Sequence, residues 1–159
     1  MSIDLVLFAT DLSREESAAW PSAARLVRAL DAKARILHVI EPVAFPYPSE
    51  GPGLDELQER LTSELLNEAR RAVRARLASL QQEWAEDLRP EKIEAVISLE
   101  GLAADTILLE AERSAAHMIL VFNRRHSTLR RLFLGSVAQQ VVSGARIPVA
   151  VIPIADEGR

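Results

Sequence analysis

The chain of 159 residues contains no cysteine, which excludes a disulfide framework, a thiolate metal site and a cysteine nucleophile. It has no apolar run that approaches the roughly 20 residues of a membrane-spanning helix. Its first residues, Met1–Asp4, carry no cationic leader. We therefore expect a cytoplasmic protein with one domain over residues 1–155 and a polar tail over residues 156–159.

Aromatic residues make up only 4% of the chain, which argues against the aromatic platforms of a nucleic-acid binder. Acidic residues are absent between positions 113 and 155, where six arginines stand: Arg113, Arg124, Arg125, Arg130, Arg131 and Arg146. Because the whole chain has a net charge of −4, this segment is +6 and the remainder is −10. The asymmetry favours a small anionic ligand over a long polyanion, although any single arginine is equally consistent with a merely solvated position.

The motifs of nucleotide-processing enzymes are missing as well. The chain has no P-loop and no H-x-G-H motif, and after its first apolar run it reads T-D-L-S-R instead of S-G-G-x-D. His38, His117 and His126 form no catalytic constellation, and no group of His, Asp and Glu has the spacing of metal ligands. We therefore predict a binding protein without catalytic or metal-ligating residues. An enzyme built on the same kind of sheet is the less favoured alternative.

Apolar runs and helical spacing alternate along the chain. Strands are predicted over residues 3–9, 34–40, 93–99, 118–122 and 148–152, and helices over residues 13–30, 54–87, 102–111 and 136–143. Ser13 with Glu16, and Ser136 with Gln139, have the capping-box spacing that opens a helix. Pro21 predicts a kink or a late regular start in the first helix, and Pro153 predicts the end of the last strand.

The longest predicted helix, over residues 54–87, contains neither Pro nor Gly. Its apolar residues recur at three- and four-residue steps and predict a single amphipathic face: Leu57, Leu61, Leu65, Ala69, Val73, Leu77, Leu80 and Trp84.

The alternation of apolar strands and helices predicts an α/β fold, a three-layer doubly wound parallel sheet of five strands with helices on both faces. Ligands of such sheets bind beyond the carboxyl ends of the strands, where the strand order reverses. For the order 3-2-1-4-5, that point lies between the first and fourth strands. Asp11 would then face the basic loop over residues 122–136, which leads into a helix N-terminus and so suits an anion.

Four segments carry a family resemblance: F-A-T-D-L-S at 8–13, I-L-H-V-I-E-P at 36–42, L-F-L-G-S-V-A-Q-Q-V-V at 132–142 and I-P-V-A-V-I-P at 147–153. With these segments at these spacings, the chain resembles the universal stress protein family over nearly its whole length. The resemblance implies the strand order 3-2-1-4-5. It also implies a homodimer made by pairing the last strands, here through Val149 and Val151.

ATP-binding members of that family carry the motif G-x-x-G-x(9)-G-[ST] after the fourth strand. This chain keeps Gly135 and Ser136 but has Phe122 and Arg125 in place of the first two glycines. Glycines at those positions let backbone N–H groups approach phosphate oxygens, so the phosphate-binding motif is only half present.

The resemblance also implies individual site residues. Asp11 and Val39 match positions that contact the adenosine part of a nucleotide, and Gly135 and Ser136 match positions that hold its phosphates. The residues themselves leave alternatives open, because Asp11 could equally cap a turn and Ser136 could cap its helix. Val39 is in addition an ordinary apolar residue at the end of a strand.

Three functions follow as hypotheses. The favoured one is a dimeric regulatory or binding module with weak or lost ATP binding, in which Arg124 and Arg125 replace missing backbone donors with charge. The alternative is an ATP-binding stress protein that acts as a nucleotide-dependent switch with slow hydrolysis. The third is a protein-binding surface on the long helix or on the loop over residues 42–53. The resemblance allows ATP or another adenine nucleotide as a cofactor without requiring one.

Overall fold

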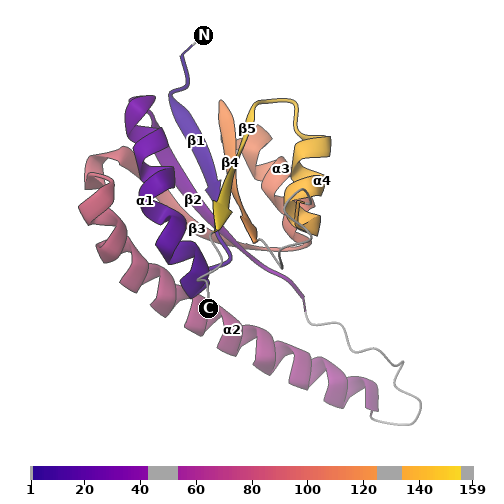
Figure 1. The fold of residues 1–159 in the computed structure, drawn as a ribbon. Coiled ribbons are helices and arrows are strands. Elements are labelled where there is room, and N and C mark those ends of the chain that lie inside the picture. Colours follow the sequence, from indigo (N-terminus) through magenta and orange to yellow (C-terminus); the bar gives the residue numbers. More distant parts are fainter. Residues whose placement is uncertain (1, 43–53, 125–133, 155–159) are drawn as a thin grey trace, which may run out of the picture.

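The computed structural model of the protein describes residues 2–42, 54–124 and 134–154. Within them, the strands β1 (Leu5–Ala9), β2 (Lys33–Ile40), β3 (Ile93–Glu100), β4 (Met118–Arg124) and β5 (Val149–Ile154) alternate with the helices α1 (Arg14–Ala29), α2 (Leu54–Asp87), α3 (Ala103–Arg113) and α4 (Ser136–Gly144) (Figure 1). A short 3-10 turn, Pro90–Lys92, precedes β3. Each predicted strand and helix is present, with ends within two residues of those expected. The polar tail and most of the basic loop lie outside the described residues.

The strands form one parallel sheet in the order β3-β2-β1-β4-β5, which confirms the predicted topology. Phe8 of β1 pairs with Ile36 of β2 on one side and with Leu120 of β4 on the other. β1 is therefore central, and its carboxyl end adjoins those of β2 and β4.

Both faces of the sheet are buried. Val6 and Phe8 of β1 join one apolar cluster with α1 and α2, whereas Leu7 and Ala9 join a second cluster with α3 and α4. This division follows from the strand geometry, because successive side chains point to opposite faces. The near-continuous apolar run of β1 thus serves two cores, and the three predicted layers are confirmed (Figure 1).

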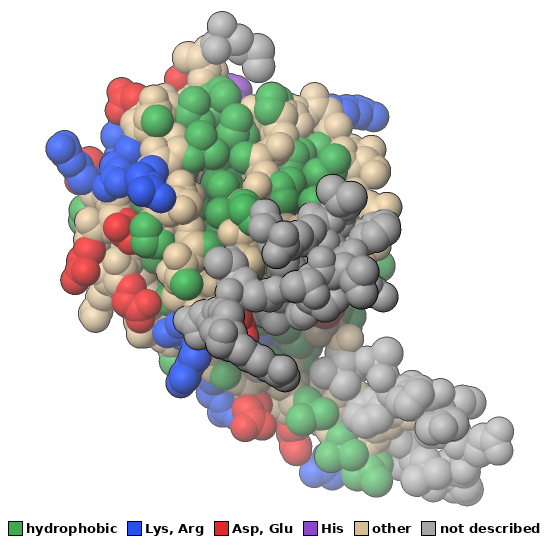
Figure 2. All heavy atoms as spheres, in the orientation of Figure 1, with side chains coloured by type: hydrophobic (Ala, Val, Ile, Leu, Met, Phe, Trp, Pro, Cys, Tyr) green, Lys and Arg blue, Asp and Glu red, His purple; other side chains and the backbone are tan. Residues whose placement is uncertain are grey.

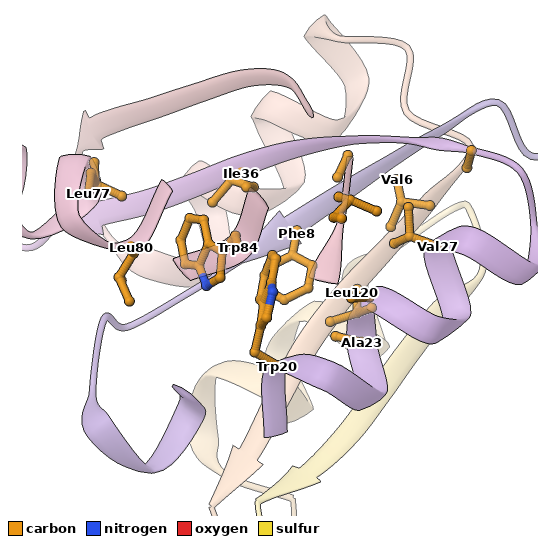
Figure 3. Close-up of a cluster of buried hydrophobic side chains, with 14 residues drawn as sticks. Val6, Phe8, Trp20, Ala23, Val27, Ile36, Leu77, Leu80, Trp84 and Leu120 are labelled. Carbon is orange, nitrogen blue, oxygen red and sulfur yellow. The ribbon is translucent and has the colours of Figure 1, made fainter. Parts of the chain in front are cut away.

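The aromatic residues that the structure describes gather in the cluster between the sheet and the helices α1 and α2 (Figure 3). Trp20 of α1 stacks on Trp84 of α2 with ring centroids 4.4 Å apart, and it contacts Phe8 at 4.3 Å. Phe122 of β4 meets Phe8 edge-on at 5.2 Å. The residue that occupies the first glycine position of the phosphate motif is therefore partly buried and packs against this core.

Two prolines were expected to affect the elements that contain them. α1 begins at Arg14 and continues through Pro21, so this proline does not mark a late start of the helix, and the kink stays a prediction. Pro153 lies inside β5 opposite Asn123, so the prediction that it ends the strand was wrong. β5 is an edge strand, and a proline is tolerated there because the side of the residue that lacks an N–H can face away from the neighbouring strand.

α2 is one continuous helix, but its apolar stripe is not one buried face. Leu77 and Trp84 are buried, whereas Leu57, Leu61 and Leu65 are 43–50% exposed. Each four-residue step moves a side chain about 40° around the helix axis, so the stripe winds away from the sheet. The first half of α2 also extends beyond the sheet (Figures 1 and 2). None of the helices described here is both long and apolar enough to cross a membrane.

Candidate ligand-binding site

A pocket of about 440 Å³ opens at the carboxyl ends of β1, β2 and β4, where the strand order reverses. Ala103 and Ile107 of α3 line one part of its wall, and residues 136–138 of α4 line another. Pockets of about 300–1,000 Å³ are typical of small-molecule sites. The pocket therefore lies where the topology predicts a ligand.

Four of the predicted site residues line this pocket: Asp11, Val39, Gly135 and Ser136. Arg124 is the last residue of β4, and its side chain is outside the described part of the structure. Arg125 lies outside the described residues altogether. The fold thus brings together residues from three segments that are far apart in the sequence.

Asp11 lies in a tight turn between β1 and α1. Its Oδ1 accepts a hydrogen bond from the Ser13 N–H at 2.8 Å, and the Leu12 N–H donates to Thr10 Oγ1 at 3.0 Å. Leu12 has a φ of 62°, a left-handed conformation that costs a residue with a Cβ about 1–2 kcal/mol. Asp11 itself is exposed. The turn-capping role and a pocket-facing position therefore coexist at Asp11.

Glu16, expected only as a capping residue, is a buried part of the pocket wall and is 7% exposed. The capping box is half formed, because the Glu16 N–H donates to Ser13 Oγ at 3.3 Å while the Ser13 N–H goes to Asp11. The Glu16 carboxyl group instead accepts the Thr10 hydroxyl at 2.6 Å and the Asp11 N–H at 3.1 Å to each oxygen. Through these hydrogen bonds, the buried carboxyl group of Glu16 stabilises the turn that contains Asp11.

The protonation of Glu16 follows from these surroundings. Burial raises its pKa to about 8, and the negative charge of Asp11 and a side-chain hydrogen bond with Asp11 act in the same direction. The hydrogen bonds from the Thr10 hydroxyl and the Asp11 N–H lower the pKa but do not offset these effects. At neutral pH, this raised pKa favours the protonated form of Glu16 beside the exposed Asp11.

Two further polar residues of the pocket wall support neighbouring elements. His38 Nδ1 lies 2.8 Å from the Thr10 carbonyl oxygen, and it must carry the hydrogen because a carbonyl only accepts. Glu41 Oε1 accepts the Ala103 N–H at 3.2 Å and so satisfies a donor in the first turn of α3. The N-cap residue of α3, Leu102, makes no side-chain cap of its own.

At the start of α4, Gly135 is the N-cap residue, and the helix has no side-chain cap. The prediction that Ser136 caps α4 was wrong, because Ser136 is already the first helical residue and Gly135 has the extended ψ of 157° that an N-cap requires. Asn123 of β4, which is 9% exposed, accepts the Gly135 N–H at 2.8 Å through Oδ1. Asn123 was not a predicted site residue, and its place at the end of a buried strand was the available signal.

The backbone does not require glycine at position 135. Its φ of −60° suits any residue, and an added Cβ would lie 3.6 Å from Asn123 Oδ1, an ordinary contact. Since Gly135 lines the pocket, a Cβ there would occupy pocket space without straining the fold. The fold itself therefore gives no reason for a glycine at this position.

These groups fit a nucleoside with one phosphate. Asp11 offers an exposed carboxylate to a ribose hydroxyl, while Val39, Ile107 and Val121 provide apolar surface for a flat base. The first N–H groups of α4 lack intrahelical acceptors and lie at the positive end of the helix dipole, which suits a phosphate. The described lining contains carboxyl groups but no Lys or Arg. Over the described ranges, no group of three or more His, Asp and Glu side chains could hold a metal ion.

Comparisons with known proteins agree with the fold and the motifs. A family model described as the universal stress protein family matches residues 3–153. A universal stress protein of Methanocaldococcus jannaschii is 28% identical over 148 residues, which are 92% of this chain and 80% of that protein. A universal stress protein solved in complex with cAMP has a TM-score of 0.65 at 18% identity, over 98% of this chain and 100% of that chain. The universal stress protein from Archaeoglobus fulgidus in complex with dAMP has a TM-score of 0.55 at 20% identity, over 96% and 99%.

Proposed function

The chain belongs to the universal stress protein family, and from this premise we propose that it is a regulatory binding module whose pocket takes an adenine nucleotide with one phosphate in preference to ATP. The observation that carries this proposal is the convergence of Asp11, Val39, Gly135 and Ser136 on one pocket. Two proteins of similar fold were solved with cAMP and with dAMP, which supports a ligand of this size.

The preference for one phosphate rests on the α4 end of the pocket. Gly135 and Ser136 place no side-chain cap of their own on the N-terminus of α4. The Gly135 N–H donates to Asn123, and the backbone N–H groups that follow it can hold one phosphate. A longer polyphosphate would need donors on the β4–α4 connection, where the side chain of Phe122 packs against the core and also lines the pocket. Arg124 and Arg125 would supply positive charge there. The affinity for ATP then depends on how far this charge compensates for the missing backbone donors.

We further propose that the protein binds its ligand without catalysis and is a cytoplasmic homodimer built on one domain over residues 1–155. β5 is an edge strand with half-buried Val149 and Val151, and such an edge invites pairing with another strand. Hydrophobic side chains gather over the part of the surface where β5 lies (Figure 2).

The proposed function is tested by calorimetric titration with AMP, cAMP and ATP, the last with Mg²⁺. We expect AMP or cAMP to bind more tightly than ATP, and Asp11→Asn to weaken all of them by on the order of tenfold, the equivalent of one lost charged hydrogen bond. Asp4→Asn, at the opposite end of β1, is the matched control and should leave binding unchanged. Tighter binding of ATP would favour the nucleotide-switch alternative, and no heat with any of them would refute the pocket assignment.

A further inference from the structure

The feature that the proposed function leaves unexplained is a buried acid in the pocket wall. Glu16 is in the first turn of α1, while the residues it holds, Thr10 and Asp11, follow β1. A helix-capping glutamate has no need to be buried, and Glu15, in the same turn, is exposed. The position of Glu16 therefore calls for a role in the turn that it supports.

The turn depends on the Glu16 carboxyl group for several of its bonds. The Glu16 carboxyl group accepts a hydrogen bond from the Thr10 hydroxyl, and Thr10 Oγ1 accepts one from the Leu12 N–H. Through Thr10, Glu16 therefore also stabilises Leu12, which has a strained left-handed backbone conformation. Glu16 also receives the Asp11 N–H directly. Displacement of this carboxyl group would release the backbone that aims Asp11 at the pocket.

Two carboxyl groups therefore lie close together at one turn: Glu16 accepts the Asp11 N–H, and the negative charge of Asp11 raises the pKa of Glu16. The exposed Asp11 is the better place for the negative charge, and the buried Glu16 is the better place for the proton. Of the charged and titratable groups near Glu16 in the described elements, Asp11 acts on it directly. His38 and Glu41 line the same pocket, and Arg76 of α2 donates to Oγ of the neighbouring Ser17 at 3.5 Å.

We propose that Glu16, as a neutral acid, is the positioning residue of the nucleotide pocket, and that ligand binding at Asp11 requires its proton. This inference rests on the proposed function, because it concerns the same pocket. When Glu16 loses its proton to the solvent, two negative charges meet at one turn, the turn opens and Asp11 no longer faces the ribose. Binding to the deprotonated protein then takes up one proton, which returns to Glu16.

The size of the effect follows from the titration of this one group. With the pKa of Glu16 near 8 and the proton required for binding, affinity falls by up to tenfold per pH unit above that value. Between pH 7.5 and pH 9.5 the expected loss is about 25-fold.

The test is calorimetric titration with cAMP between pH 6.5 and pH 9.5, because its phosphodiester keeps one negative charge throughout. We expect the affinity of the native protein to fall about 25-fold above pH 7.5, and that of Glu16→Gln, which keeps a neutral acceptor, to stay constant. Glu15→Gln is the matched control, and it should follow the native profile. Adenosine, which is uncharged, should lose affinity in parallel with cAMP, because the turn itself opens.

The outcomes separate this inference from the proposed function. If cAMP binds the native protein equally at every pH, or if Glu16→Gln shows the same fall, the proton has no role and the nucleotide function stands. If cAMP loses affinity while adenosine does not, repulsion between the ionised Glu16 and the phosphate explains the pH dependence, and a role of Glu16 in positioning Asp11 is overturned. If neither ligand binds at pH 6.5, the proposed function itself fails. Titrations in buffers of different ionisation enthalpy count the protons directly in the native protein, and uptake of none at pH 8.5 would overturn the proposal even if Glu16→Gln did not fold.

Discussion

The buried proton of Glu16 predicts a pH-dependent stability that can be measured without any ligand. Folding moves this carboxyl group from water into the wall of the pocket, and its pKa rises from 4.5 to about 8. The variant Glu16→Gln has a similar shape and keeps an acceptor for the Thr10 hydroxyl and the Asp11 N–H, but it cannot ionise. The native protein should therefore lose stability relative to this variant as pH increases.

The sign and size follow from proton linkage. Below pH 4.5 the carboxyl group is protonated in both the folded and the unfolded chain, so pH has no effect through this group. Between the two pKa values only the folded chain holds the proton, and the free energy of unfolding falls by about 1.4 kcal/mol per pH unit. From pH 5 to pH 8 the loss amounts to about 3.5 kcal/mol, a large part of the 5–15 kcal/mol that stabilise a typical domain.

The assay is urea unfolding at unit steps from pH 5 to pH 8, followed by the fluorescence of the stacked Trp20 and Trp84. Other titrating groups affect native protein and variant alike, so the difference between the two isolates Glu16. That difference should grow with pH in favour of Glu16→Gln, while the exposed Glu15→Gln should track the native protein. A difference that stays within about 0.5 kcal/mol over the whole range would show that Glu16 is ionised in the folded chain and would refute the reasoning.

Three other predictions concern the fold, the glycine and the dimer. Arg35→Ala leaves the buried Glu110 without its 2.8 Å partner and should lower the free energy of unfolding by about 3 kcal/mol in urea titrations, whereas breaking the exposed Arg70–Glu100 pair by Arg70→Ala should have a smaller effect. Gly135→Ala should leave stability within about 0.5 kcal/mol, since its Cβ makes only ordinary contacts, but it should weaken cAMP binding in calorimetry, and a reversed pattern would mean that the glycine serves the fold. Val151→Lys should give monomers by light scattering if β5 forms the dimer, and a dimer that survives points to another interface.

The elements could be predicted from the sequence because their signals are local. The apolar run of β1 and the spacing of α2 determine strand and helix with little help from distant residues. The exposure of Leu57, Leu61 and Leu65 could not be predicted, because it depends on where the sheet ends beneath the helix. Local periodicity says that a face is apolar, but it does not say how far the neighbouring layer extends.

The site was predictable to the extent that it consists of residues at strand ends and helix starts. Asp11 and Gly135 occupy such places, and the topology alone brings them to one pocket. Glu16 and Asn123 were missed because their roles arise from tertiary contacts. The capping-box spacing distinguishes Glu16 from Glu15, but it does not indicate that the Glu16 side chain is buried while the Glu15 side chain is exposed. Asn123 accepts a hydrogen bond from Gly135, which is 12 residues further along the chain, and no sequence motif indicates that these two residues meet.

The replacement of the motif glycines has a consequence for ligand choice that the pocket itself explains. Phe122 packs on Phe8, and β4 continues for two more residues and pairs Asn123 with Pro153. Asn123 Oδ1 then accepts the Gly135 N–H, a donor at the start of α4 that a bound phosphate would otherwise use. A phosphate must compete with an amide oxygen already 2.8 Å away, so fewer backbone donors are left for a polyphosphate than for one phosphate on the first turn of α4. The packing of Phe122 and the Asn123–Gly135 hydrogen bond are therefore the basis of our proposal that the pocket takes smaller adenine nucleotides in preference to ATP.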